Sequence, residues 1–180
     1  MPNTRHPRWI LLVLSLLAFA SAGWVHADLK TNQIKAAYLY QISKFVFWPA
    51  NRKNLAQFQV CQFGDDTYDG TLDKMTGRNV FNQPVAIRRV DGVDQAEGCH
   101  LLILPDANVV PADKLIAWVK GKGILTVVEG AENLDHAMVA FVLENQRVRL
   151  HINLGLAEQA GLSFAANLLE VASHIKRGSP

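Results

Sequence analysis

Residues 100–130 have the sequence HLLILPDANVVPADKLIAWVKGKGILTVVEG, in which two short apolar runs flank an amphipathic segment. The first run, residues 100–104, ends at Pro105 and has the continuous apolar character of a strand buried on both faces. Residues 111–120 begin with proline and repeat apolar residues every third or fourth position, which predicts a helix. Residues 124–128 predict a second buried strand. This strand–helix–strand unit is typical of a parallel sheet with a right-handed crossover.

Shorter signals precede this unit. Residues 58–63 alternate apolar and polar side chains like a half-buried strand, and Gly64-Asp65-Asp66 marks a turn after them. Residues 71–75 predict a short helix. Residues 85–90 predict another strand, so the order of strands and helices continues to favour an α/β fold.

The C-terminal third predicts a hairpin and two closing helices. Residues 139–144 and 147–152 are two strands separated by two residues, a spacing that favours a hairpin. Helices are predicted over residues 154–160 and 164–175. We therefore expect a single α/β domain: a mostly parallel central sheet with a C-terminal antiparallel hairpin, flanked by helices.

The N-terminus has the pattern of an export signal. A basic start precedes the apolar run of residues 10–20, and small residues follow it. The run is far shorter than the roughly 20 residues that span a bilayer, so we expect no membrane insertion. The predicted organisation is a signal peptide over residues 1–27 and one domain over residues 28–180, with cleavage after Ala27 or, alternatively, after Ala22.

The charge balance argues against nucleic acid as a partner. The chain has 18 Lys and Arg against 16 Asp and Glu, but Arg5 and Arg8 belong to the predicted signal peptide. Residues 28–180 are therefore formally neutral. A basic footprint for nucleic acid or for an anionic membrane is absent.

Cys61 and Cys99 are the only cysteines of the chain. An oxidising compartment outside the cytoplasm favours a disulfide between them. Both lie beside predicted strands, and neighbouring strands of one sheet bring cysteines within bonding distance. Two buried free thiols are the alternative.

An aromatic-rich helix is predicted over residues 31–48, with Thr31 or Asn32 as its N-cap and a stop before Pro49. Core packing explains some of its rings, but a helix cannot bury its whole circumference against one sheet. The remaining side chains are candidates for contact with another subunit or partner. The candidates on this segment are Tyr40, Lys44, Phe47 and Trp48.

The predicted hairpin carries the other candidates. Arg147 and Arg149 alternate on one strand and therefore share a face, which is either a solvated sheet edge or a contact for an anion or a partner. His151 follows on the same strand and is also a candidate. Asn153 stands between a strand and a helix, where its side chain is predicted to cap the helix.

Common catalytic and metal-binding motifs are absent from the sequence. There is no Gly-x-Ser-x-Gly, no phosphate-binding Gly-x-x-x-x-Gly-Lys-Ser/Thr and no His-Glu-x-x-His. Cys99 and His100 are adjacent, and neighbours on a strand point to opposite faces, so they are no nucleophile–base pair. The histidines of residues 28–180 lack the spacings that zinc sites use. We expect no enzymatic activity, no metal and no cofactor.

Two motifs carry a resemblance to a known family. Residues 34–49, IKAAYLYQISKFVFWP, resemble the opening helix of the YfiR family, whose pattern is IKAAxLYxxxKFxxWP. Residues 141–154, FVLENQRVRLHINL, are similar to the hairpin and Ile-Asn-Leu motif of the family. Cys61 and Cys99 fall where the structural disulfide of that family would lie. His151 is a departure, because many members carry Glu there.

The resemblance implies a function. Proteins of the YfiR type are periplasmic, usually dimeric, and bind the periplasmic domain of an inner-membrane diguanylate cyclase, which they repress. An outer-membrane lipoprotein can sequester the repressor, which raises cyclic di-GMP and favours biofilm. By resemblance, this chain is such a repressor. The alternative is a periplasmic module that binds a small molecule, an aromatic amino acid or a nucleotide, for another membrane sensor.

Overall fold

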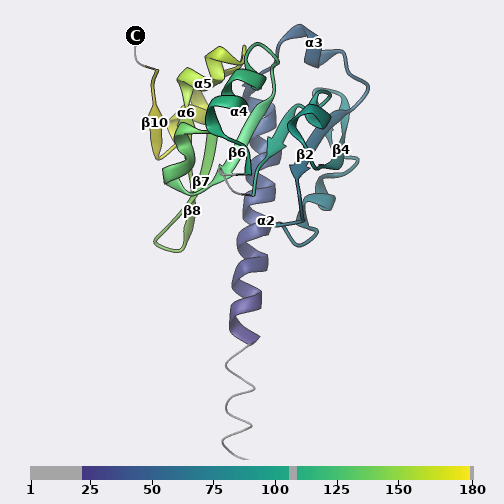
Figure 1. Ribbon diagram of the computed structural model, residues 1–180. Coiled ribbons are helices and arrows are strands. Elements are labelled where there is room, and N and C mark those ends of the chain that lie inside the picture. The colour runs from purple at the N-terminus through teal and green to yellow at the C-terminus, as the bar shows by residue number, and fades with distance from the viewer. Residues whose placement is uncertain (1–21, 106–108, 179–180) are drawn as a thin grey trace, which may run out of the picture.

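The computed structural model describes residues 22–105 and 109–178, in which helices flank an eight-stranded sheet (Figure 1). The order across this sheet is β10-β8-β7-β6-β5-β2-β4-β3, and β1 pairs with β9 in a separate two-stranded sheet. The strands are β1 (Val46–Phe47), β2 (Phe58–Phe63), β3 (Asn79–Val80), β4 (Gln83–Val90), β5 (Leu101–Ile103), β6 (Leu125–Glu129), β7 (Val139–Glu144), β8 (Arg147–Asn153), β9 (Ser163–Phe164) and β10 (His174–Lys176). The helices are α2 (Ala22–Phe45), α3 (Ala50–Lys53), α4 (Ala112–Val119), α5 (Leu154–Gln159), α6 (Ala166–Val171) and the 3₁₀ helices η1 (Thr71–Met75), η2 (Val93–Ala96) and η4 (Ala131–Asp135).

The pairing confirms the predicted α/β class and mostly parallel sheet. Strand β2 is parallel to β4 and to β5, and β6 is parallel to β5 and to β7. Strands β7 and β8 form the predicted antiparallel hairpin, in which Glu144 lies opposite Arg147. The two turn residues, Asn145 and Gln146, have φ of 49° and 61°. Two positive φ angles match the turn that joins strands with a right-handed twist.

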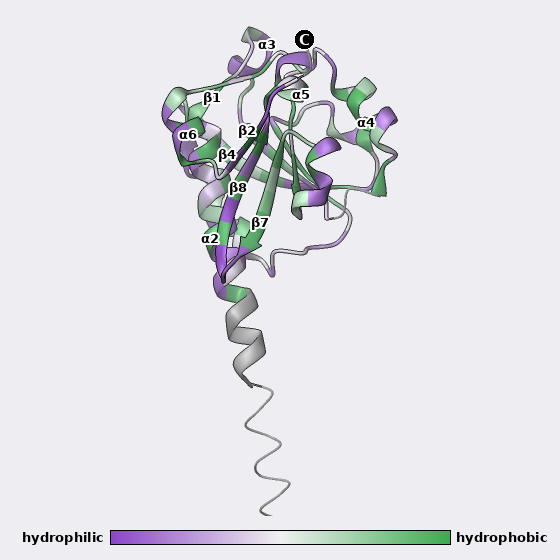
Figure 2. Cartoon of the chain, turned by 90° about the vertical axis from the view of Figure 1, so that its left-hand side faces the viewer, coloured by the Kyte–Doolittle hydropathy of each residue, from purple (hydrophilic) through white to green (hydrophobic). Residues whose placement is uncertain are grey.

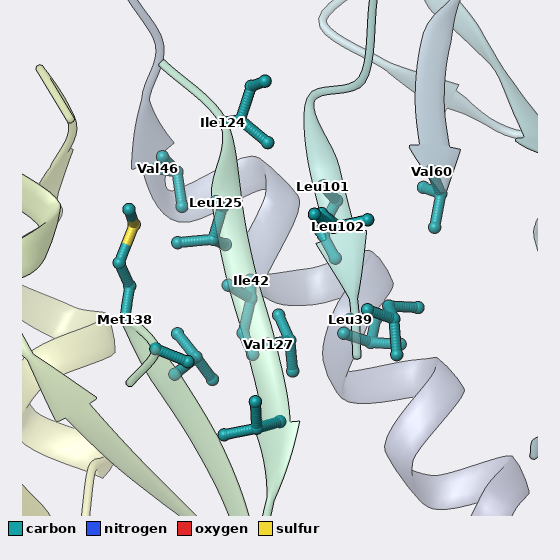
Figure 3. Close-up of a cluster of buried hydrophobic side chains, with 14 of the residues drawn as sticks. Leu39, Ile42, Val46, Val60, Leu101, Leu102, Ile124, Leu125, Val127 and Met138 are labelled. Atoms are coloured by element: carbon teal, nitrogen blue, oxygen red, sulfur yellow. The ribbon is translucent and has the colours of Figure 1, made fainter. Parts of the chain in front are cut away.

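The apolar runs of the central strands explain the core. Helix α2 lies across one face of the sheet and α4 lies on the other (Figure 2). Leu39 and Ile42 of α2 are fully buried against side chains of β5 and β6, among them Leu101 and Val127 (Figure 3). Strands that are covered on both faces consist mainly of apolar residues, as residues 101–104 and 124–128 do. The one polar residue in these runs, Thr126, is buried, and its hydroxyl accepts a hydrogen bond from the Met138 N–H (3.1 Å).

Helix α2 begins earlier and ends slightly earlier than predicted. It runs from Ala22 to Phe45, so the prediction that Thr31 or Asn32 caps it was wrong. The helix continues toward the N-terminus because no proline interrupts residues 22–30. Asn32 instead donates hydrogen bonds to the Thr67 carbonyl (3.2 Å) and to the Asp69 carboxylate (2.9 Å), which tie the helix to the loop after β2.

The predicted helix over residues 164–175 was also wrong in extent. The segment contains β9, the short helix α6 and the edge strand β10. Ala165 is extended (ψ 146°), and its N–H donates to the Phe45 carbonyl (2.8 Å). After α6, the Ser173 N–H donates to the Leu150 carbonyl (2.9 Å), and β10 then pairs in parallel with β8. Hydrogen bonds to a free strand edge outweigh helix propensity here.

The disulfide between Cys61 and Cys99 is confirmed. It joins β2 to the residue two positions before β5, with the two Cα atoms 5.9 Å apart. Both cysteines are fully buried. The bond therefore braces two adjacent central strands from inside the domain.

Residues 1–21 lie outside the described part of the chain, so most of the predicted signal peptide does too. Both predicted cleavage positions, Ala22 and Ala27, fall in the first turns of α2. Within the described ranges, no helix has both the length and the apolar character that crossing a membrane requires.

Candidate partner-binding surfaces

The candidate residues fall on two separate surfaces. We call the first the aromatic cavity; it is a hollow where α2, β1, α3, the β3–β4 turn and the start of α6 meet. The second is the hairpin face, the exposed side of β8 and β10 that carries Arg147, Arg149 and His174. Figure 2 shows β7 and β8 side by side toward the viewer, with β1, α3 and α6 at the upper left.

The end of α2 positions the first group. Because β1 pairs with β9, Val46 lies opposite Phe164 and Phe47 lies opposite Ser163. Alternation along this short strand turns Val46 inward and leaves 60% of Phe47 exposed. The next residue, Trp48, is again buried.

Trp48 is a core residue rather than an exposed contact. It is 4% exposed, and its indole N–H donates to the Ser43 carbonyl (3.0 Å). Its ring meets Phe58 edge-on at 5.3 Å between centroids, and His100 at 5.5 Å. The structure therefore assigns Trp48 mainly a packing role, since the chain reverses direction here and needs a large apolar anchor.

Tyr40 is likewise largely buried. It is 7% exposed, and its hydroxyl donates to the Asn79 carbonyl (3.0 Å). The Lys44 ammonium lies 4.1 Å from the ring centroid and the Arg78 guanidinium 3.8 Å from it. The attraction between its ammonium group and the Tyr40 ring holds Lys44 near the rim of the aromatic cavity. Of the four predicted residues on this segment, Lys44 and Phe47 are the accessible ones.

The aromatic cavity has a volume of about 430 Å³. The residues that line it are Lys44, Phe45, Val46, Phe47, Trp48, Lys53, Phe81 and Ala165. Sequence reasoning missed Phe81, which lies in the two-residue turn between β3 and β4 and is 56% exposed. The signal that was available is Asn82 beside it, because asparagine is common in two-residue hairpin turns.

The hairpin face presents its arginines as predicted from their spacing. Arg147 and Arg149 are exposed, whereas Val148 between them is buried against the core. Val148 is 8% exposed. Alternation along β8 thus places both guanidinium groups in solvent on one side of the sheet.

His151 lies on the same strand but is only 9% exposed. The reason is β10, a strand that the sequence did not predict, which places His174 opposite it with the ring centroids 5.2 Å apart. The Nε2 atom of His151 lies 3.3 Å from a Glu144 carboxylate oxygen. His151 is therefore on the same side of β8 as the two arginines, but it is largely covered by the neighbouring strand β10.

Asn153 lies at the end of β8 and caps α5. Its side-chain oxygen accepts from the Leu156 N–H (3.2 Å), and its amide donates to the Leu134 carbonyl (2.9 Å). The side chain is buried and both of its polar ends are bonded. Asn153 is structural.

The buried His100 is also structural. Its Nδ1 accepts from the Gln59 N–H (3.1 Å), and its Nε2–H donates to the Arg52 carbonyl (2.9 Å). Its ring stacks on Phe58 at 4.2 Å between centroids. Desolvation lowers the pKa of His100 to about 4, so the ring is neutral at physiological pH.

The candidate side chains can bind a partner but show no catalytic arrangement. Cys99 is held in the disulfide, and its neighbour His100 uses both ring nitrogens in hydrogen bonds. In the described ranges, no three His, Cys, Asp or Glu side chains gather as ligands for a metal ion. The exposed cations and aromatic rings instead favour recognition of an anion or of an acidic or apolar surface.

A family model described as YfiR/HmsC-like matches residues 32–173. No curated protein matches the sequence. Among solved structures, a conserved domain protein from Vibrio cholerae O1 biovar El Tor str. N16961 is similar, with 10% identity and a TM-score of 0.47. The match covers 78% of this chain and 60% of that chain.

Proposed function

Because the chain belongs to the YfiR/HmsC-like family, we propose that it binds the periplasmic domain of an inner-membrane diguanylate cyclase and holds the cyclase in its inactive state. The family indicates a periplasmic regulator of diguanylate cyclase signalling, and repression by direct binding is the finer part of the proposal. The observation that carries it is the family match over residues 32–173, which includes the lining of the aromatic cavity and both arginines of the hairpin face.

The hairpin face is the proposed docking surface for the cyclase. Two exposed guanidinium groups project from one side of β8, and a strand holds them at fixed spacing. Arginine makes bidentate hydrogen bonds to carboxylates, so this face suits an acidic patch on the partner. Surface charges of this kind speed association and select the partner.

Repression requires that the protein bind the inactive cyclase more tightly than the active cyclase. A rigid domain supports such discrimination, because little binding energy is spent on ordering it. The buried Cys61–Cys99 bond and the apolar packing of α2 against β5 and β6 supply that rigidity. Loss of the disulfide is therefore expected to weaken repression.

The proposal includes export, assembly and release. The signal peptide over residues 1–27 would deliver residues 28–180 to the periplasm, where the disulfide forms. A homodimer is the proposed active form, and an outer-membrane lipoprotein is the proposed antagonist that sequesters it. The protein is proposed to act without catalysis or a cofactor.

A gene deletion tests the proposal in cells. Cells that lack the protein are expected to contain several-fold more cyclic di-GMP, because the cyclase is no longer held inactive. Re-expression of the exported protein restores the low level, whereas a version without residues 1–27 stays in the cytoplasm and does not. Unchanged cyclic di-GMP after deletion, with the cyclase present, contradicts the proposal.

One observation, the aromatic cavity, also favours the second candidate function, a module that binds a small molecule. Its volume of about 430 Å³ lies within the range of small-ligand sites. The two functions can coexist, since the cavity and the hairpin face are on separate elements.

A further inference from the structure

We infer that the aromatic cavity binds a small aromatic carboxylate: a molecule of one or two rings that carries one negative charge and no amino group. The inference rests on the second candidate function and deepens it by naming the class of ligand. It differs from an aromatic amino acid, whose ammonium group the cavity disfavours.

The shape and lining of the cavity suit an aromatic body. Four of its eight lining residues are Phe or Trp, and the remaining apolar surface comes from Val46 and Ala165. Phe47 and Phe81 are 60% and 56% exposed at its rim. Large apolar side chains that stay exposed in pairs mark a binding site more often than scattered single ones do. Two such rings can enclose a flat ring by edge or face contacts.

The charge of the lining selects an anion. Lys44 and Lys53 line the cavity, and no carboxylate does. Among the ion pairs of the described residues, neither lysine takes part. A carboxylate gains from these charges, whereas an ammonium group is repelled.

The backbone at Phe81 is an outlier that points to function. Phe81 has a φ of 48° and Asn82 a φ of 67°. A bulky residue rarely adopts positive φ, and such strain persists where it has a use. The equivalent first position of the other two-residue hairpin turn holds Asn145, which tolerates that conformation readily. Placing a phenyl ring over the cavity is a use that explains the exception.

The walls of the cavity are fixed before any ligand arrives. Trp48 is anchored by its hydrogen bond to the Ser43 carbonyl, and the Ala165 N–H donates to the Phe45 carbonyl at 2.8 Å. Pairing of Val46 with Phe164 holds β1 in place. A preformed site loses little affinity to ordering on binding.

Titration calorimetry on the exported protein tests the inference with three probes that share an indole ring. Indole-3-acetate is an anion, tryptophan is a zwitterion and tryptamine is a cation. We expect indole-3-acetate to bind at least tenfold more tightly than tryptophan, and tryptamine to bind most weakly. Octanoate separates an aromatic from an acyl preference and is expected to bind several-fold more weakly than indole-3-acetate.

Two variants locate the site. Phe81→Asn fits the positive φ, so the turn should fold, and it is expected to reduce affinity for indole-3-acetate at least tenfold. Lys53→Gln is expected to reduce it several-fold. The matched controls are Leu143→Asn and Lys114→Gln, which remove an exposed leucine and an exposed lysine away from the cavity and should leave affinity unchanged.

The outcomes separate the inference from the function on which it rests. Equal or tighter binding of tryptophan or of a nucleotide overturns the inferred ligand class and leaves a small-molecule module standing. Binding of indole-3-acetate that Phe81→Asn does not change overturns the site. Absence of binding by every probe and by a panel of amino acids and nucleotides overturns both.

Discussion

The aromatic cavity and the hairpin face differ in how their side chains are held. Around the cavity, exposed Phe47 is followed directly by Trp48, which is 4% exposed and anchored in the core. On the hairpin face, Arg147 and Arg149 extend into solvent from a strand whose core contacts come from Val148 between them. Residues of the aromatic cavity therefore also contribute to the stability of the fold, whereas charges on the hairpin face can change with little loss of stability. This difference suits a preformed ligand site and a charged docking face.

The largest expected effect is at the cavity wall. Trp48→Ala should lower the free energy of unfolding by about 3–5 kcal/mol, because it leaves a large void in the core. Urea unfolding followed by circular dichroism measures this. The neighbouring Phe47→Ala is the matched control and should cost less than about 1 kcal/mol, since Phe47 is 60% exposed. Equal losses of unfolding free energy for the two variants would contradict the distinction between the buried Trp48 and the exposed Phe47.

The disulfide comes next. Replacing both cysteines with alanine should cost roughly 3–4 kcal/mol of unfolding free energy, the loop-closure contribution expected for a sequence separation of 38 residues. Reduction of the wild-type protein by dithiothreitol should produce a similar loss in the same urea assay. A loss below about 1 kcal/mol in both cases would show that the bond does not brace β2 and β5 in the way proposed.

His100 gives the core beneath the cavity a pH dependence. The ring is neutral when folded because desolvation lowers its pKa from 6.5 to about 4. As pH falls from about 6.5 to 4, the unfolded chain takes up the proton first, so stability is lost over that window by roughly 3 kcal/mol. Below about pH 4 this loss stops growing. Urea unfolding at several pH values should show a steeper decline for the wild type than for His100→Gln, and identical slopes would contradict the assignment.

The smallest expected effect on stability is at the hairpin face. Replacing Arg147 and Arg149 with alanine should change the free energy of unfolding by no more than about 0.5 kcal/mol, because both side chains are solvated. Thermal unfolding of the double variant beside wild type measures this. A loss of 2 kcal/mol or more would mean that the arginines serve the fold, and the contrast between the two surfaces would fail.

Local sequence patterns predicted the centre of the fold well. The strands Phe58–Phe63 and Val139–Glu144 and the short helix Thr71–Met75 have the predicted bounds. In these segments the periodicity of apolar residues and the turn residues agree with the final environment, so local and tertiary preferences coincide.

The errors fall where distant partners determine the structure. Strand β1 exists because β9 pairs with it, and β10 exists because the edge of β8 is free to accept it. Neither pairing leaves a strong signal in the sequence of one segment, so the last helix was predicted too long. The candidate sites were predicted unevenly for the same reason. Spacing along one strand placed Arg147 and Arg149 correctly on one face. It could not show that Trp48 and Tyr40 are buried, or that Phe81 lines the cavity, because these depend on contacts with distant segments.

The central claim is that an exposed basic face binds the cyclase, and direct binding tests it best. Calorimetry should titrate the exported protein with the purified periplasmic domain of the diguanylate cyclase from the same cell. Wild type and the control Lys114→Glu/Lys120→Glu should bind alike, whereas Arg147→Glu/Arg149→Glu, with the same change in charge, should bind at least tenfold more weakly. Failure of the wild type to bind, or equal affinity for all three proteins, would contradict the account.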